Sequence, residues 1–402
     1  MKKLILFLFA ATCSINFTNA QWQSTNGPYG AGSISWIANI GTNIFAATTT
    51  GGVSLSTNGG SWTAVNNGLA DTNVWCLAVN GSNIYAGTQA GGVFLSSDTG
   101  KSWTAVNNGL SISSPIYALA INGTNIFAGS FTGGVFLSTN NGGNWMNVSN
   151  GLATNYIISL AVKGTDIFAG TFGGGVFLSS DTGKTWTTVN SGLTTSSQIF
   201  SLAVSGTNIF AGTYGNGIFL STNNGGSWTA VNNGLSDTTI WSLAIYGSNI
   251  FAGTVGGGVF LSTNNGGNWV ALYNGSPPTN AISLAIIETD IFIGGSSSGV
   301  WKGALSNVLS VQENISVNDN DFSFYPNPAT NQLTIHNSSI QNEAVTVSVM
   351  NVLGQTMLSC SPLLGRRAGG EVAIDIKALP AGIYFLQMKT EAAIETKRFV
   401  KE

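Results

Sequence analysis

One short phrase recurs six times along the chain, and every copy ends in tryptophan. The copies read STNGGSW (56–62), SSDTGKSW (96–103), STNNGGNW (138–145), SSDTGKTW (179–186), STNNGGSW (221–228) and STNNGGNW (262–269). Successive tryptophans are 41 or 42 residues apart. A period near 40 residues, in a chain rich in glycine and aromatic residues, is typical of the blades of a β-propeller.

Each period divides into four short strands separated by turn sequences such as NGT and NNGG. The first strand type begins near residues 34, 74, 116, 157, 199, 240 and 281, which gives seven copies. The last copy is followed by no tryptophan phrase, but QWQSTNGPYG (21–30) aligns with SWTAVNNGLA (61–70) and places Trp22 before Trp62 at the repeat distance. The sequence therefore predicts an all-β fold, in which residues 21–305 form a seven-bladed propeller closed by its N-terminal strand.

The charge distribution argues against a nucleic-acid partner. The net charge is −3, and only 7% of the residues are charged. No arginine or histidine occurs before residue 306, and the lysines of that segment after the N-terminal pair are Lys101, Lys163, Lys184 and Lys302. Binding that depends on neutralising phosphates needs clustered lysine or arginine, so we expect no nucleic-acid partner.

The N-terminal residues have the features of an export signal. Residues 1–20 combine two lysines, an apolar run too short to span a membrane and a small-residue cleavage site before Gln21. Cys13 leaves a lipoprotein signal as the alternative, although the residues before it fit that motif poorly. Cys76 and Cys360 are too few for a disulfide framework, and no later stretch predicts a transmembrane helix.

The recurring phrase resembles the Asp-box, or BNR repeat, whose pattern is S-x-D-x-G-x-[ST]-W. This repeat is found in sialidases, sortilin-type receptors, some xyloglucan-cleaving glycosidases and photosystem II assembly factors. The resemblance covers residues 21–305 and implies the propeller fold. It does not imply an activity, because the fold carries several unrelated ones.

The boxes themselves are predicted to be structural. Their acidic position holds aspartate in two copies and asparagine in four, so the shared requirement is a side-chain oxygen that accepts backbone hydrogen bonds in an Asx-type turn. The predicted turn residues are Asn58, Asp98, Asn140, Asp181, Asn223 and Asn264, and the predicted buried indoles are Trp62, Trp103, Trp145, Trp186, Trp228 and Trp269. One carboxylate per loop is too few for calcium, so we predict no metal and no cofactor.

Two carboxylates remain as weak catalytic candidates. Asp71 in GLADTN and Asp237 in GLSDTT each lie in a loop that leads into an innermost strand, and a glycosidase needs two such groups. The alternative is that both are solvated loop residues. A sialidase-type site is not expected, because the arginines that grip the substrate carboxylate are missing from the propeller segment.

Aromatic residues cluster at the end of the repeats where the loops lead into the innermost strands. Phe131, Phe172 and Tyr214 occupy equivalent positions in the loop between the second and third strands of adjacent repeats. Residues at the start of innermost strands include Trp75, Tyr117 and Trp241. Such side chains could stack on sugars or grip a peptide, or they could pack between blades. We predict a non-enzymatic module that binds a glycan or a protein; the alternatives are a glycosidase using Asp71 and Asp237 and a ligand-free scaffold or adhesin.

The repeat ends before the C-terminal quarter of the chain. Residues 306–321 are polar and predict a linker, and residues 322–402 predict a small β-sandwich. The phrases YPNPATNQL (325–333), NVLGQ (351–355), LPAGIYFLQ (379–387) and KRFVKE (397–402) resemble the type A sorting domain of the Bacteroidota type IX secretion system. The resemblance implies that this machinery is a partner of residues 322–402, and that the protein is released or attached to the cell surface.

Overall fold

The computed structural model describes residues 22–194, 197–272, 279–310, 323–326, 329–336, 345–351, 356–363, 371–389 and 394–401. The chain divides into two compact units, residues 1–312 and 313–402. The predicted signal peptide lies outside the described residues.

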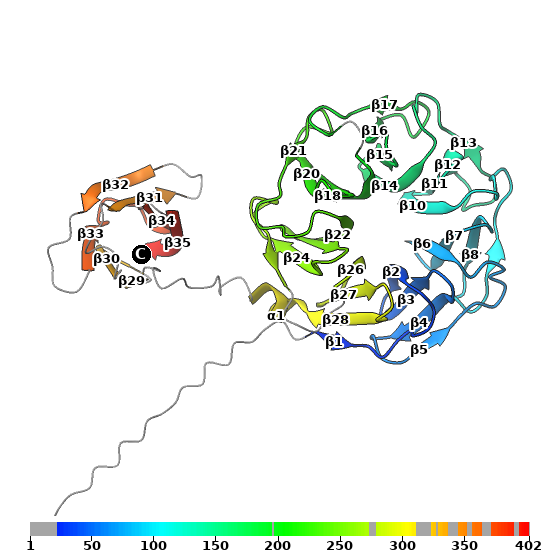
Figure 1. The fold of residues 1–402 in the computed structure, drawn as a ribbon, viewed down its shortest axis with the longest axis horizontal. Coiled ribbons are helices and arrows are strands. Elements are labelled where there is room, and N and C mark those ends of the chain that lie inside the picture. Colours follow the sequence, from blue (N-terminus) through cyan, green and yellow to red (C-terminus); the bar gives the residue numbers. More distant parts are fainter. Residues whose placement is uncertain are drawn as a thin grey trace, which may run out of the picture. The chain divides into compact units, whose positions relative to one another are not determined.

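The first unit is a ring of antiparallel sheets, as Figure 1 shows. Within the described residues it contains seven four-stranded sheets, so the predicted seven-bladed propeller is confirmed. We number the blades 1 to 7 in the order of their innermost strands. The innermost strands surround the centre of the ring, and they are β2 (Ile34–Ile40), β6 (Val74–Asn80), β10 (Ile116–Asn122), β14 (Ile157–Lys163), β18 (Ile199–Ser205), β22 (Ile240–Tyr246) and β26 (Ala281–Ile287).

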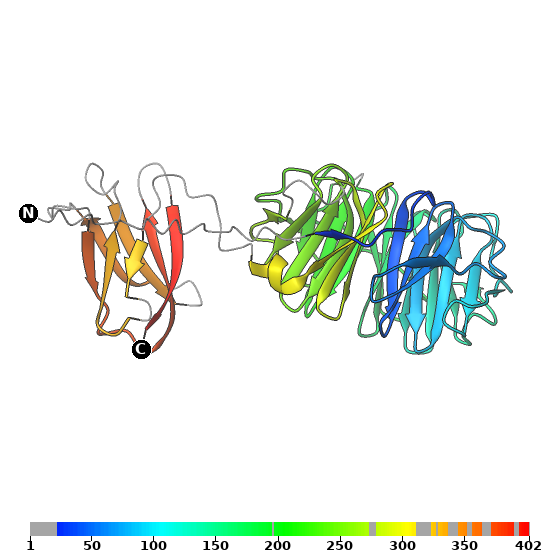
Figure 2. The same cartoon turned by 90° about the horizontal axis from the view of Figure 1, so that it is seen from below.

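The other strands follow outward in each blade, and Figure 2 shows most strands of the ring running roughly along its axis. The second strands are β3 (Asn43–Thr48), β7 (Asn83–Thr88), β11 (Asn125–Ser130), β15 (Asp166–Thr171), β19 (Asn208–Thr213), β23 (Asn249–Thr254) and β27 (Asp290–Gly295). The third strands are β4 (Gly52–Thr57), β8 (Val93–Ser96), β12 (Gly134–Ser138), β16 (Val176–Ser179), β20 (Ile218–Ser221), β24 (Val259–Ser262) and β28 (Val300–Ala304). The outermost strands are β5 (Trp62–Ala64), β9 (Thr104–Ala105), β13 (Met146–Asn147), β17 (Thr187–Thr188), β21 (Thr229–Ala230), β25 (Val270–Ala271) and β1 (Gln23–Ser24).

The second strand of each blade forms the core between neighbouring sheets. In β11, NIFAGS, the five residues after Asn125 are all buried, because another blade covers each face of the sheet. Phe127 is fully buried. A Cβ atom at Gly129 would lie 2.6 Å from Ile157 of the next blade, so glycine allows the two sheets to approach closely.

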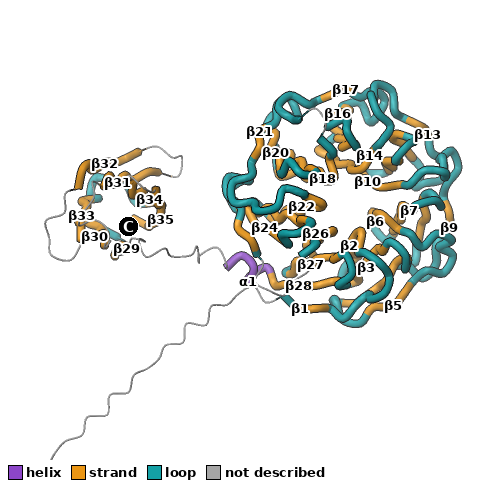
Figure 3. The backbone as a smooth tube through the Cα atoms, in the orientation of Figure 1, coloured by secondary structure: helices purple, strands orange, loops and turns teal. Residues whose placement is uncertain are grey.

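The N-terminal strand closes the ring, as predicted. Strand β1 pairs with β28 at the rim in Figure 3, with Gln23 opposite Lys302. Trp22 is 7% exposed, and its Nε1 donates a hydrogen bond to the carbonyl of Leu272 in the preceding blade at 3.0 Å. Trp103 makes the corresponding bond to Val65. Trp22 therefore serves blade 7 as the box tryptophans serve the others.

The propeller continues beyond its predicted end at residue 305. Residues 305–310 form a short helix, α1 (Leu305–Ser310), whose Leu305 and Val308 are buried in one cluster with Trp22. Leu309 packs against the same cluster. The linker was predicted to begin at residue 306, and this is wrong because LSNVL places its apolar residues at helical spacing and covers the closing blade.

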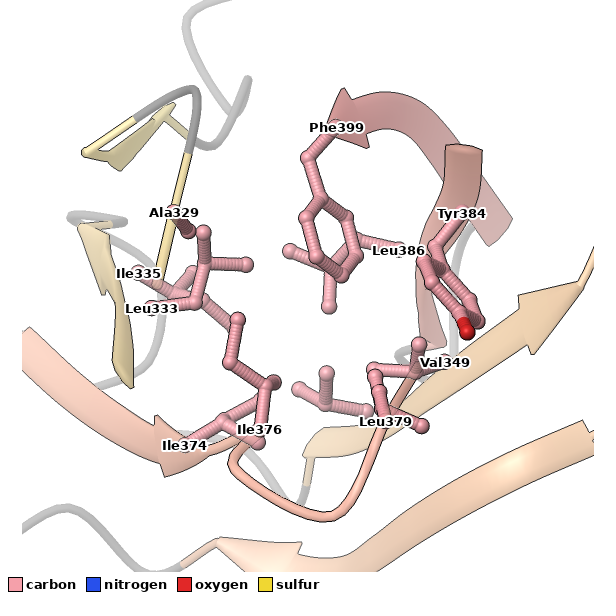
Figure 4. Packing of buried hydrophobic residues seen from close by; sticks show 11 residues of the cluster. Ala329, Leu333, Ile335, Val349, Ile374, Ile376, Leu379, Tyr384, Leu386 and Phe399 are labelled. Carbon is pink, nitrogen blue, oxygen red and sulfur yellow. The ribbon is translucent and has the colours of Figure 1, made fainter. Parts of the chain in front are cut away.

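The second unit is a small sandwich of two antiparallel sheets within the described residues. One sheet has the order β29 (Ser323–Tyr325), β30 (Gln332–His336), β33 (Glu371–Asp375), and the other has the order β32 (Thr356–Leu363), β31 (Val345–Asn351), β34 (Gly382–Lys389), β35 (Ile394–Lys401). In Figure 4, Leu333 and Ile374 of one sheet point toward Leu386 and Phe399 of the other. The predicted β-sandwich is therefore confirmed.

Candidate functional site

The carboxylate of Asp181 is bound within its own turn. Its Oδ1 accepts hydrogen bonds from the backbone N of Thr185 at 2.9 Å and from Oγ of Ser179 at 2.8 Å, and its Oδ2 accepts from the Thr185 hydroxyl at 2.6 Å. The hydrogen bond from the Thr185 hydroxyl is the main cause that lowers the pKa of Asp181 from 3.8 to about 2. Asp98 has the same arrangement with Ser102 and the same lowered pKa.

The asparagine boxes keep this turn without a charge. Oδ1 of Asn223 accepts from the backbone N of Ser227 at 2.8 Å, and its Nδ2 donates to the Ser227 hydroxyl at 3.0 Å. Asn140 and Asn264 accept the equivalent backbone bond at 2.8 Å. The geometry in these five boxes thus needs an acceptor oxygen and not a charge.

The first box departs from the prediction. Asn58 has φ 57°, which is the conformation of Asn141 (φ 56°), the residue after the acceptor in the third box. STNGGSW is one residue shorter than the other copies, so Asn58 occupies the left-handed position and not the acceptor position. Oγ of Ser56 is consequently buried without a hydrogen-bond partner. The prediction that Asn58 is an Asx-turn acceptor is wrong for this reason.

The box indoles connect neighbouring blades. Trp62 is half-buried and donates to Oγ1 of Thr25 at 2.9 Å. The other five are 3–4% exposed, and each donates its Nε1 to a backbone carbonyl of the preceding blade at 2.7 Å; they are Trp103, Trp145, Trp186, Trp228 and Trp269. These contacts hold the ring together and leave no indole of the five exposed to a ligand.

The two candidate catalytic carboxylates fasten loops of their own blades. Oδ1 of Asp71 accepts from the backbone N of Asn73 at 3.0 Å, and Oδ2 accepts from the backbone N of Ala90 at 2.6 Å and of Gly91 at 2.9 Å. Asp237 makes the same three bonds, to Thr239, Gly256 and Gly257. Neither residue lines the central hollow described next.

A hollow of about 490 Å³ lies at one end of the innermost strands. Each of these strands shifts register after its first residue; in β10, Ile116 pairs with Ser130 but Ala118 pairs with Gly129, so Tyr117 has no partner on β11. Such a bulge turns the side chain of the extra residue. The seven bulge residues all line the hollow, and they are Ser35, Trp75, Tyr117, Ile158, Phe200, Trp241 and Ile282.

Blade 1 supplies an aromatic residue that sequence reasoning missed. Oγ of Ser35 donates to the carbonyl of Val74 at 2.5 Å, and the adjacent Trp36, which is 40% exposed, lines the hollow. The aromatic residue of this strand lies one position later than Trp75 or Tyr117 in theirs. Comparing the first innermost strand with the other six would have drawn attention to it.

Loop residues of three adjacent blades lie beside the hollow. The backbone N of Phe131, Phe172 and Tyr214 each donates to the residue preceding an innermost strand, at 2.9, 2.9 and 3.1 Å. Phe131 and Phe172 line the hollow. Tyr214 lies outside its lining, is 54% exposed and contacts Phe200, with ring centroids 5.8 Å apart. Tyr156, which the sequence analysis also missed, is exposed and contacts Phe131, with ring centroids 5.2 Å apart.

The hollow carries no charged side chain. Its described lining consists of serine, threonine, alanine, leucine, isoleucine and aromatic residues. Burial raises the pKa of Tyr117 above its ordinary value of 10, so this hydroxyl stays neutral at physiological pH. Among the described residues there is also no group of three or more histidine, cysteine, aspartate or glutamate side chains that could hold a metal ion. The hollow therefore offers shape and apolar surface and contains no acid–base pair.

Comparison with known families identifies the second unit. Residues 323–402 match the family described as the secretion system C-terminal sorting domain. The C-terminal unit is a type IX sorting domain. Proteins with this sorting domain are secreted to the cell surface or beyond, and this protein is therefore a type IX cargo. In the described part of the chain, no helix has the length and apolar character needed to cross a membrane.

Solved structures resemble the chain in fold. PorZ, a surface component of the type IX secretion system of Porphyromonas gingivalis, is 16% identical with a TM-score of 0.54, over 93% of this chain and 60% of PorZ. YCF48 from Cyanidioschyzon merolae is 16% identical with a TM-score of 0.56, over 71% and 99%. The xyloglucanase from Xanthomonas campestris is 16% identical with a TM-score of 0.57, over 71% and 54%. No curated protein matches the sequence. These likenesses support the propeller fold and, at such identities, nothing more.

Proposed function

We propose that the propeller of this type IX cargo is a non-enzymatic module that binds a glycan or a protein in its central hollow. One observation carries the proposal: the described lining is rich in aromatic side chains and contains no carboxylate, imidazole, ammonium or guanidinium group. An uncharged aromatic hollow suits binding through contact and stacking. It lacks the groups that acid–base chemistry requires.

The bonding of Asp71 and Asp237 argues against a glycosidase. Such an enzyme uses one carboxyl group as a proton donor and another as a base or nucleophile, and both must reach the scissile bond. Here each carboxylate accepts three backbone N–H groups of its own blade. A protonated acid would lose at least one of these bonds, so the geometry supports a role in fixing the loops.

The exposed aromatic residues argue against a scaffold without a ligand. Trp36 and Phe172, both in the lining, are 40% and 42% exposed. Large apolar side chains gathered at one exposed site usually mark a place of contact with another molecule. A scaffold that binds no ligand would be more soluble with polar residues at these positions.

Two assays on the secreted full chain test the proposal together. Glycan and peptide arrays measure binding, and product analysis on a panel of polysaccharides measures hydrolysis. We expect array binding that is weakened in Trp36→Ala and no products from any glycan. Hydrolysis that disappears in the double variant Asp71→Asn/Asp237→Asn would show that the protein is a glycosidase and that the proposal is wrong.

A further inference from the structure

We infer that the occupant of the hollow is an uncharged, extended peptide segment anchored by a bulky apolar side chain, and that it is not a glycan. This inference rests on the proposed binding function and names the class of ligand. It follows from three features: the hydrogen-bonding groups of the lining, the arrangement of its aromatic rings and the asymmetry of its rim.

The lining offers few groups for sugar hydroxyls. No asparagine, glutamine, aspartate, glutamate or arginine occurs among its described residues. Several of its hydroxyls are engaged by the protein: Ser35 and Ser159 donate to carbonyls of neighbouring blades at 2.5 and 2.8 Å, and Ser33 donates to the carbonyl of Ser296. The buried hydroxyl of Ser201 has no hydrogen-bond partner among the described residues. The indole of Trp75 donates to Gln89 at 2.6 Å. A buried sugar would leave several of its own hydroxyls unpaired, which is unfavourable.

The aromatic rings form a curved wall and not a flat platform. The ring centroids of Trp75 and Tyr117 are 4.9 Å apart, with an angle of 75° between the ring planes. Those of Tyr117 and Phe131 are 5.3 Å apart, with an angle of 87°. Phe131 and Phe172 continue the series at 6.1 Å and 75°. Ring edges thus alternate with ring faces around the wall. A sugar stacks best on one flat face, whereas an apolar side chain fits a curved wall of this kind.

The rim is apolar on one side only. We call the half-buried Phe131 and the exposed Tyr156, Phe172 and Tyr214, on blades 3 to 5, the aromatic ledge. The equivalent loop position holds the apolar and exposed Val255 in blade 6, but Thr49 and Gln89 in blades 1 and 2. A ligand that fills the hollow therefore has further apolar contacts in one direction, which suits a chain longer than the hollow.

The backbone of the ledge is not available for strand addition. The N–H groups of Phe131, Phe172 and Tyr214 are already bonded to Pro115, Tyr156 and Gln198. Recognition along the ledge consequently depends on side-chain contact, and the uncharged lining favours a ligand without charge near its anchor.

The first experiment uses N-phenyl-1-naphthylamine, a neutral apolar dye that fluoresces when it leaves water. We expect the full chain to bind it, and Trp36→Ala to weaken binding by about tenfold, as for an aromatic anchor. Tyr246→Ala is the matched control, because this exposed tyrosine lies at the opposite end of β22 from the lining residue Trp241. Absence of dye binding, or equal binding by Trp36→Ala, would overturn both the inference and the proposed site.

The second experiment identifies the class of ligand by displacement of the dye. Peptides blocked at both ends and rich in leucine and phenylalanine are compared with cello-oligosaccharides and xyloglucan oligosaccharides of similar length. We expect the peptides to displace the dye and the oligosaccharides to fail. Tyr214→Ala should weaken a long peptide by several-fold and weaken dye binding less, because Tyr214 belongs to the ledge and reaches the lining only through its contact with Phe200. Displacement by oligosaccharides alone would refute the peptide assignment and leave the binding function standing.

Discussion

Replacement of Trp22 by alanine tests how the ring is closed. The indole of Trp22 is 7% exposed, shares a buried cluster with Leu305 and Val308, and donates to the carbonyl of Leu272. Strand β1 itself contributes only two paired residues, opposite Trp301 and Lys302. Bonds between Thr25, Gly27 and Val300 extend this pairing, and the indole of Trp22 adds the large buried apolar contact.

The size of the effect follows from the burial of the indole. A large aromatic side chain removes about 150–250 Å² from water, which corresponds to at most about 4–6 kcal/mol. Substitutions of buried Trp by Ala cost about 3–5 kcal/mol because they lose this transfer energy and leave a cavity. We expect Trp22→Ala to lower the free energy of unfolding of the propeller by about 3–5 kcal/mol. We expect a loss of the same size for Trp186→Ala, which removes a box indole within the ring.

Urea unfolding followed by far-UV circular dichroism measures these losses. Trp62→Ala serves as the graded comparison, because Trp62 is only half-buried and bonds to a side chain, Oγ1 of Thr25. Its cost should be clearly smaller than that of Trp22→Ala. If Trp22→Ala cost less than about 1 kcal/mol while Trp186→Ala kept its large cost, the N-terminal strand would not be what closes the ring.

Three further predictions concern the carboxylates. Asp181→Asn should lower the urea midpoint less than Asp181→Ala, because asparagine keeps the acceptor oxygen; equal losses would show that the charge matters. Since the pKa of Asp98 and of Asp181 is lowered from 3.8 to about 2, their stabilisation is complete above pH 3.8 and is lost as the pH falls toward 2. Asp98→Asn/Asp181→Asn should therefore flatten the fall of the urea midpoint over this pH range, and an unchanged profile would contradict it. Asp71→Ala should cost about 1–3 kcal/mol and speed hydrogen exchange at Ala90 and Gly91, while the Asp237 loop stays protected; unchanged exchange would show that Asp71 does not fasten the loop.

Features that repeat along the chain could be predicted from the sequence. The number of blades follows from the seven copies of the innermost strand, and the closing role of Trp22 follows from its distance in sequence to Trp62. The exchange of aspartate for asparagine between Asp181 and Asn223 indicated an Asx turn, because the backbone bonds it makes are local. The hydrogen bonds of both residues agree with that turn.

Features that depend on small irregularities or on distant contacts could not be predicted. The loss of one residue from the first box moves Asn58 into the left-handed position, although its letters still resemble the motif. Trp36 was missed because it lies one position later in β2 than Trp75 does in β6, although both strands carry the same bulge. The hydrogen bond that the backbone N of Ala90 donates to Asp71 joins residues 19 apart in sequence, so the loop alone does not reveal it. Helix α1 is too short for its period to stand out.

One binding measurement tests the central claim most directly. It compares the dissociation constants of wild type and Trp36→Ala for a ligand selected on the arrays, and the ligand is analysed afterwards by mass spectrometry. The claim is that the aromatic hollow binds a ligand without converting it. We predict that Trp36→Ala weakens binding by about tenfold and that the ligand is recovered unchanged. Equal dissociation constants for the two proteins, or recovery of a cleaved ligand, would contradict the claim.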